Sequence, residues 1–218
     1  MEEGFNRSGS VTVLWLGSVS SMHSYATDRE QDWACSLGLT RKKRFLCSRS
    51  WMRSCLGHLW GMHALDIPLH APPGSPPSLP SGWGFLSLSH SSGSALLAWS
   101  AEPIGVDLER LDRHFAAQAL MSRYFLPAEQ ERLRALDRHA FQQAVLEYWL
   151  IKEAAIKWQQ GSLAQDLAHW IVEADGLSAC HLLSGAQIYA QRRQLGPWGL
   201  AIVSARKQSL TDAMICLN

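Results

Sequence analysis

The chain has 218 residues, a formal net charge of +1, 47% hydrophobic residues and 18% charged residues. This composition is typical of a folded globular protein and excludes a largely disordered chain. A near-neutral chain has no overall attraction for nucleic acid or anionic membrane, so any anion site must be a local cluster. The length suffices for one large domain or two small ones.

The N-terminal sequence and the cysteines indicate in which cellular compartment the protein is expected. Glu2 and Glu3 are acidic where a secretory signal would be basic, and the apolar run 11–17 is too short to span a membrane. The five cysteines form no CxxC pair, which favours free thiols in a reducing compartment. We therefore expect a soluble cytoplasmic protein.

The first half alternates helical and strand patterns around a proline-rich loop. Apolar, β-branched and alternating runs predict strands over residues 11–16, 83–90, 95–99 and 104–109. A helical segment is expected over 28–64 and a loop over 66–84, where prolines and glycines exclude regular structure. The turn Ser91-Ser92-Gly93 makes the second and third strands a hairpin.

The second half repeats this order of helices followed by strands. Helices are expected over 127–136, which begins at Pro127, and 140–160, which stops before Gly161. Strands are expected over 170–173, 178–183, 187–192 and 200–205. The sequence therefore predicts an α+β fold with two similar halves, although no literal repeat is present.

Asp107 and Glu109 lie two residues apart on a predicted strand, which places both side chains on one face. Two unpaired carboxylates on one face repel each other, and a hard divalent cation relieves that repulsion. The alternative is a strand face whose acids are simply solvated. Spacing alone favours that alternative.

Glu153 and Lys157 lie four residues apart on the second long helix. On an exposed helix this order stabilises by roughly 0.2–0.5 kcal/mol and needs no function. Trp149 lies on the same face, however, and apolar residues occupy several sides of the helix. A buried acid and lysine need partners, so spacing leaves both interpretations open.

A basic run, 41–44, is followed by Arg49 and Arg53 on the first predicted helix. Such a run is usually a solvated face, but several cations can also converge on one phosphate group. Ser89-His90 ends a predicted strand, where a turn offers backbone donors beside an imidazole. A lone histidine is more often structural.

Four segments in this order resemble the phosphopantetheinyl transferases, in particular the long monomeric class typified by the surfactin synthetase activator. The two that carry the resemblance best are Gly105-Val106-Asp107-Leu108-Glu109 and Trp149-Leu150-Ile151-Lys152-Glu153-Ala154-Ala155-Ile156-Lys157. Upstream, Leu86-Ser87-Leu88-Ser89-His90-Ser91 is similar to the strand of that family that ends in Ser-His-Ser, and Arg44-Phe45, Arg53 and Leu56-Gly57 resemble its basic first helix. The resemblance covers residues 41–161.

The resemblance implies two pseudo-symmetric α+β halves, each a small antiparallel sheet with packed helices, over residues 1–103 and 104–218. Coenzyme A would lie in the cleft between them. The implied enzyme transfers 4′-phosphopantetheine from coenzyme A to a serine of an apo acyl or peptidyl carrier protein, leaving adenosine 3′,5′-bisphosphate. It would be a cytoplasmic monomer that serves fatty-acid, polyketide or nonribosomal-peptide carriers.

The resemblance also assigns roles to residues. Magnesium, or manganese in its place, would be bound by Asp107, Glu109 and Glu153, with Asp107 also beside the coenzyme. Glu153 would act as general base, and Lys157 would contact the pyrophosphate. The remaining implied coenzyme contacts are Ser89, His90, Arg53, Arg41 and Arg44. Spacing assigns no task to Lys152, so we expect it to form a structural salt bridge.

One departure from the family stands out: Gly74-Ser75-Pro76 replaces the usual Gly-Lys-Pro turn near the adenine. A side-chain charge from that turn is therefore not expected. Two other classes of function stay open. One is a non-enzymatic module for a phosphorylated ligand, which would not need three acids. The other is a nucleic-acid-binding domain using residues 41–53, against which the near-zero net charge and the absence of a known motif argue.

Overall fold

The computed structural model describes residues 12–19, 25–207 and 214–217. Its elements in chain order are β1 (Thr12–Ser18), α1 (Asp28–Ala34), α2 (Leu39–Trp60), β2 (Phe85–Ser91), β3 (Ser94–Ser100), β4 (Ile104–Arg110), α3 (Ala117–Tyr124), α4 (Pro127–Arg134), α5 (Arg138–Gln159), α6 (Leu163–Asp166), β5 (Trp170–Val172), β6 (Ser178–His181), β7 (Gln187–Leu195), β8 (Trp198–Ser204) and β9 (Met214–Leu217). A short 3₁₀ turn covers Ala64–Asp66. None of the described helices has the length and hydropathy that a membrane crossing requires.

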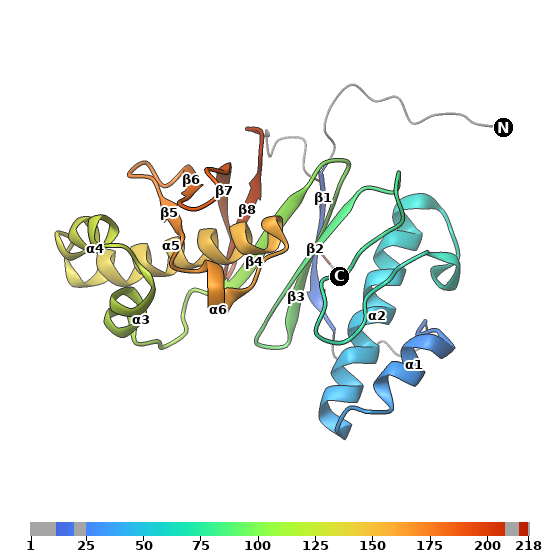
Figure 1. The fold of residues 1–218 in the computed structure, drawn as a ribbon. Helices are drawn as coiled ribbons and strands as arrows, with labels where there is room; N and C mark the ends of the chain where they lie inside the picture. Colours follow the sequence, from blue (N-terminus) through green and yellow to red (C-terminus); the bar gives the residue numbers. More distant parts are fainter. Residues whose placement is uncertain (1–11, 20–24, 208–213, 218) are drawn as a thin grey trace.

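The strands form two sheets, and a long helix covers each (Figure 1). The first sheet has the order β2-β3-β1-β9 and the second the order β4-β8-β7-β6-β5. Pairing is antiparallel throughout the second sheet, and in the first sheet β9 alone runs parallel to its neighbour, β1. The expected α+β fold with two sheets and packed helices is confirmed.

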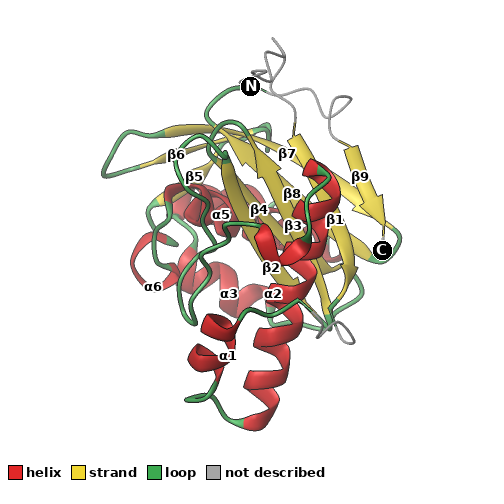
Figure 2. Ribbon diagram, turned by 90° about the vertical axis from the view of Figure 1, so that its right-hand side faces the viewer, coloured by secondary structure: helices red, strands yellow, loops and turns green. Residues whose placement is uncertain are grey.

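Alternation along the strands explains how the layers stack. On β1, Val13 and Trp15 pack into a core with α2, while Leu14 and Leu16 pack against residues of β4 and β8. Because successive strand residues point to opposite faces, one sheet can serve two cores. The second sheet likewise contacts α5 on its other face, so the two sheets form the middle of the molecule (Figure 2).

The long helices begin and end where the local sequence permits. Asp137 caps α5 by accepting hydrogen bonds from the amides of His139 and Ala140. At the end of α2, Gly61 takes the left-handed conformation, with φ 64°, and its amide bonds back to the carbonyl of Gly57.

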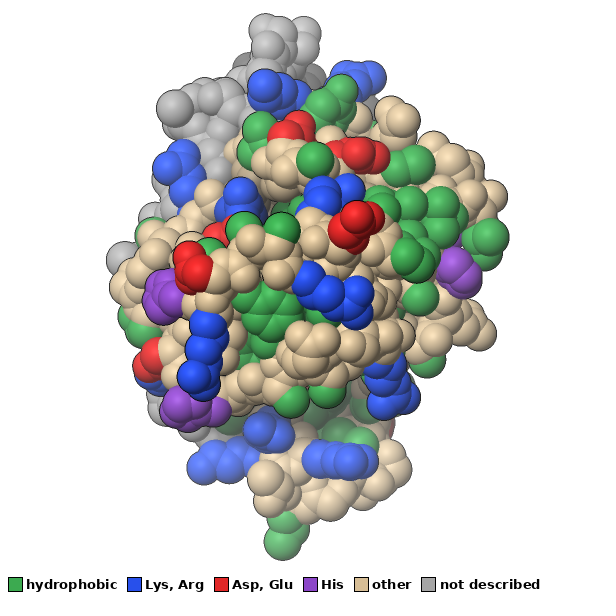
Figure 3. Space-filling view, turned by 90° about the vertical axis from the view of Figure 1, so that its left-hand side faces the viewer, with side chains coloured by type: hydrophobic (Ala, Val, Ile, Leu, Met, Phe, Trp, Pro, Cys, Tyr) green, Lys and Arg blue, Asp and Glu red, His purple; other side chains and the backbone are tan. Residues whose placement is uncertain are grey.

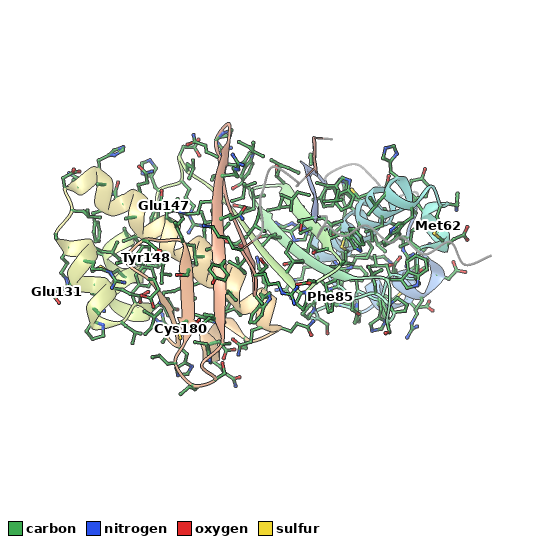
Figure 4. All side chains as sticks on the ribbon, turned by 90° about the horizontal axis from the view of Figure 1, so that it is seen from above. Met62, Phe85, Glu131, Glu147, Tyr148 and Cys180 are labelled. Carbon is green, nitrogen blue, oxygen red and sulfur yellow. The ribbon has the colours of Figure 1, made fainter. Side chains whose placement is uncertain are left out.

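Seen from above, Met62 and Phe85 of the first half lie on the opposite side of the molecule from Tyr148 and Cys180 of the second (Figure 4).

Two serines of β2 join the edges of the sheets. Ser87 Oγ accepts a hydrogen bond from the amide of Val106 at 2.9 Å, and Ser89 Oγ accepts one from the amide of Leu108 at 3.2 Å. Side-chain hydroxyls thus satisfy amides on the edge of β4 that carry no strand partner on that side. This seam brings the end of β2 beside the middle of β4.

Most predicted elements are present with shifted ends. The helix expected over 28–64 is broken at Gly38, which has an extended backbone and begins α2. The loop expected over 66–84 holds an isolated bridge between His70 and Ser78. Helices α3 and α6 and strand β9 were not predicted. Because β9, the last strand described, belongs to the first sheet, the division at residue 103 stays a prediction.

Candidate active site at the seam of the two sheets

Asp107 is the buried centre of the site, with only 2% of its surface exposed. Its Oδ1 accepts hydrogen bonds from Ser89 Oγ at 2.7 Å and from Lys157 Nζ at 2.6 Å. Its Oδ2 is also buried but has no hydrogen-bond partner among the described residues. An unpaired buried carboxylate oxygen is costly, so it marks a position where a cation or donor is missing.

Gly105 lets α5 approach this strand closely. A Cβ at Gly105 would lie 2.0 Å from the carbonyl oxygen of Ala154 and 2.7 Å from the amide nitrogen of Trp158. Only glycine leaves room for that backbone contact. The close approach brings Glu153 and Lys157, one turn apart on α5, beside Asp107.

Glu153 is half-buried next to the other acids, and its Oε2 lies 3.9 Å from Lys157 Nζ. Burial and the negative charges of Asp107 and Glu109 together raise the pKa of Glu153 to about 8, against the opposing charge of Lys157. The helix salt bridge that spacing suggested is therefore present, but it belongs to a crowded group of acids.

Glu109 is held differently, because both of its oxygens have partners. Ser91 Oγ donates to Oε2 at 2.9 Å, and Arg113 donates to Oε1 at 2.8 Å. Burial nevertheless raises the pKa of Glu109. Sequence reasoning missed Ser91 and Arg113. The alternation Ser87-X-Ser89-X-Ser91 was visible as a hydroxyl row on one face of the strand, but not its target.

His90 points to the other side of β2, where it meets α2. Its Nε2 lies 3.1 Å from Ser48 Oγ. Desolvation and the charges of Arg49, Lys157 and Arg44 lower the pKa of His90 to about 4. His90 is nevertheless an exposed residue, and the three cations favour its neutral imidazole. They define a positive environment that reaches from α2 to α5.

The arginines of α2 divide into two groups. Arg41 and Arg44 are exposed near the start of the helix. Arg49 is buried, and it donates to the carbonyls of Ala71 at 2.9 Å and of Pro72 at 3.3 Å. These two bonds fix the proline-rich loop against α2.

The guanidinium of Arg53 is fully engaged inside the protein, which argues against the coenzyme-phosphate contact that the resemblance implied. Its guanidinium is buried, forms an ion pair with Glu30 at 3.0 Å and donates to the carbonyls of Ile67 and Leu69 at 2.6 and 3.2 Å. No exposed face remains for a phosphate, because 4% of the residue is accessible. Helical spacing placed Arg53 with the other cations but could not see Glu30 on α1.

Lys152 also has a structural role, as expected. It is fully buried, donates to Glu129 Oε2 at 2.8 Å and to the carbonyl of Trp170, and lies 4.8 Å from the ring centroid of Phe125. Glu129 in turn accepts the amide of Val172. Lys152 therefore ties α5 to α4 and β5 rather than facing the site.

The donor set fits a hard divalent cation. Carboxylate oxygens are what magnesium prefers, and Asp107 Oδ2 is an oxygen without a donor. The raised pKa of Glu153 reflects burial beside like charges, which a bound cation would offset. Asp107 and Glu153 fit this role best, since both oxygens of Glu109 are already engaged.

Two comparisons with known proteins agree with this geometry. Residues 103–203 match the family model described as the 4′-phosphopantetheinyl transferase superfamily. Over 121 residues the chain is 33% identical to the 4′-phosphopantetheinyl transferase HetI of Nostoc sp. strain PCC 7120. The aligned region covers 53% of this chain and 51% of HetI. The chain thus spans about half the length of that curated relative.

Proposed function

We propose that this chain moves 4′-phosphopantetheine from coenzyme A to a serine of an apo carrier protein. Residues 103–203, which carry the three carboxylates and Lys157, match the model of the 4′-phosphopantetheinyl transferase superfamily, a family of enzymes, and this match supports the proposal. The observation that carries the proposal is Asp107, whose Oδ1 binds Lys157 while its buried Oδ2 has no partner among the described residues. A binding module would not need this group of acids beside a lysine.

The substrate would lie along the seam. Coenzyme A is a polyanion, and the positive charges of Lys157 and Arg44 both act on His90, which lies between α2 and the acids. We assign the pyrophosphate to Lys157 and the remaining phosphate to His90 and Arg44, with Ser89 holding Asp107 in place. Arg41 is an exposed cation at the start of α2, three residues before Arg44, and stays a candidate contact.

The bond changes require charge neutralisation and a proton acceptor. The carrier serine Oγ bonds to the β-phosphorus, the bond from that phosphorus to the bridging oxygen breaks, and adenosine 3′,5′-bisphosphate leaves. Glu153 accepts the serine proton, because a bound cation would offset its raised pKa and keep this carboxylate ionised. Lys157 stabilises the charge on the leaving phosphate. When bound by Asp107 and Glu153, with Glu109 beside them, magnesium or manganese would supply neutralisation of the pyrophosphate oxygens.

The function is tested by incubating the protein with coenzyme A, magnesium and a panel of apo acyl and peptidyl carriers. A mass gain of one phosphopantetheine on a carrier is the expected result. No gain on any carrier, with a positive-control transferase active on the same panel, overturns the proposal. The panel also decides between fatty-acid, polyketide and peptide carriers, and sizing of the protein alone tests the expected monomer.

The general base is tested on α5 itself. Glu153→Gln should lower the rate by about 10²–10⁴-fold while coenzyme A still binds. Glu147→Gln is the matched control, because Glu147 lies on the same helix but pairs with Arg192 (Figure 4). Full activity of Glu153→Gln would rule out this role and leave the transfer itself untouched.

The surface that would bind the carrier protein has no single dominant charge. On the face of the second half seen in Figure 3, Lys and Arg side chains are spread among acidic and apolar ones. We place carrier binding on this half because it contributes Glu153, and we propose a cytoplasmic setting, where coenzyme A and carriers are available.

A further inference from the structure

A second group of polar side chains lies beyond the end of α5, outside the seam. Asp166 ends α6, His169 follows it, and His181 ends β6, directly after Cys180, which Figure 4 labels. One ligand atom from each of the three lies within 4.8 Å of the other two. Neither the proposed transfer reaction nor the family match assigns a role to them.

Both histidines present buried nitrogens that lack partners. The side chain of His181 is 4% exposed, and its Nε2 has no hydrogen-bond partner in the described structure. The same holds for Nδ1 of His169. A buried nitrogen without a partner is destabilising, so two of them beside one carboxylate need an explanation.

The spacing of the ligand atoms suits a metal ion better than a hydrogen bond. Asp166 Oδ1 lies 3.6 Å from His181 Nε2, which is too long for a hydrogen bond. Zinc binds nitrogen and oxygen at about 2.0–2.2 Å with tetrahedral angles, which puts two of its ligands about 3.3–3.5 Å apart. The observed separation is close to that value.

Neighbouring groups hold Asp166 in position. Its Oδ2 accepts a hydrogen bond from the amide of Ser162 at 2.7 Å. A Cβ at Gly161 would lie 2.4 Å from that oxygen, so glycine is what admits the carboxylate. Oδ1 is thereby left pointing to the histidines.

His181 is also fixed. Its ring packs edge-on against Trp170, and its Nδ1 lies 3.0 Å from Ser184 Oγ and 3.2 Å from the amide of Ser184. Without a metal, Nδ1 accepts from that amide and the hydrogen sits on Nε2. Metal binding at Nε2 moves the hydrogen to Nδ1, so the Ser184 amide must turn away from Nδ1 while Nδ1 donates to Ser184 Oγ, an outer contact that typically orients a histidine ligand.

We propose that Asp166, His169 and His181 bind a divalent transition-metal ion of the zinc class. Two imidazoles and one carboxylate favour zinc, nickel or cobalt over magnesium, which prefers oxygen ligands only. Three protein ligands leave a fourth position for water. The ion ties the segment after α5 to β6 and so braces the end of the helix that carries Lys157.

The test titrates the chelator-treated protein with Zn²⁺ alone, in excess Mg²⁺ to occupy the seam carboxylates. The expected result is one tightly bound zinc per chain by metal analysis, with a rise in melting temperature as zinc is added. Asp166→Asn keeps an acceptor for the Ser162 amide, and His169→Ala changes a half-buried residue. Each should lose roughly 100-fold in zinc affinity and the rise in melting temperature.

Matched controls separate this site from others on the chain. His139→Ala removes an exposed histidine, and Cys35→Ser removes an exposed thiol; neither should change the stoichiometry or the affinity. Binding by Co²⁺ should give the spectrum of a tetrahedral nitrogen–oxygen site without a thiolate band. No saturable zinc binding by the parent protein, undiminished affinity in either ligand variant, or loss in Cys35→Ser overturns the proposal. None of these readouts depends on transferase activity.

Discussion

Arg53 gives the sharpest test of the structure, because the family resemblance implied a coenzyme contact for it while its guanidinium is buried against Glu30. Arg53→Met leaves Glu30, whose side chain is 1% exposed, without its counter-charge. Removing one partner of a buried ion pair typically destabilises by about 3–5 kcal/mol. Since domains of this kind are stable by about 5–15 kcal/mol, the single variant should approach unfolding.

The double variant separates charge burial from the loss of a coenzyme contact. Arg53→Met with Glu30→Gln removes both charges, and the amide oxygen at position 30 can still accept the amide of Thr27. The remaining loss comes from the carbonyls of Ile67 and Leu69, which lose their donors at a cost of about 1–3 kcal/mol each. Urea unfolding measures both variants, and the double variant should be the more stable one.

Kinetics on the double variant complete the test. If Arg53 is structural, the ratio of kcat/KM for coenzyme A to that for 3′-dephospho-coenzyme A should match that of the parent. A lost contact to the 3′-phosphate would instead remove about 1.5–3 kcal/mol, or roughly 10–150-fold, for coenzyme A only. Arg44→Met is the control expected to show that loss. A double variant that loses the preference, or is no more stable than the single one, refutes our account of Arg53.

Three further predictions concern packing and charge. Gly105→Ala should abolish activity and destabilise the protein, because its Cβ would overlap the backbone of α5, whereas Gly38→Ala, with open space around it, should be nearly neutral in both assays. Lys152→Met should destabilise by about 3–5 kcal/mol in urea, and adding Glu129→Gln should recover most of that loss if the buried pair is structural. The lowered pKa of His90 means that, between pH 6.5 and 4, the unfolded chain binds a proton that the folded chain does not. Stability should therefore fall as the pH drops from 6.5 toward 4, and His90→Gln should flatten that slope. An NMR titration that shows an ordinary pKa for His90 would count against the cationic environment.

Both long helices and eight of the nine described strands were predictable from the sequence, whereas α3, α6 and β9 were not. Helix α5 (Arg138–Gln159) was expected over 140–160, α2 lies inside the segment that was expected to be helical, and the β2–β3 hairpin follows from the turn Ser91-Ser92-Gly93. Helix α3 has eight residues and is held by buried Ala117 and Met121, a tertiary contact that no local pattern encodes. Strand β9 pairs in parallel with β1, about 200 residues earlier, so local signals could not reveal it.

For the site, spacing found the acids but not their partners. The alternation of side chains along a strand placed Asp107 and Glu109 on one face of β4. The four-residue spacing of a helix placed Glu153 and Lys157 on one side of α5. The same helical argument failed for Arg53, because it predicts which residues share a side of a helix and not what covers that side. Arg53 is instead held by Glu30, 23 residues earlier in the chain, with which it forms a buried ion pair.

The family match covers residues 103–203, yet the site extends beyond it. Ser89 and His90 belong to β2, and Arg44 belongs to α2, all upstream of the matched segment. Ser89 both positions Asp107 and satisfies an amide of β4, so the seam that joins the sheets also shapes the acid group. The matched segment alone would carry the acids and Lys157 but would lack the hydroxyl that orders Asp107 and the cations expected to bind phosphate. Catalysis by the proposed mechanism would therefore need side chains from both sheets, and we expect the first sheet and α2 to contribute directly to the active site.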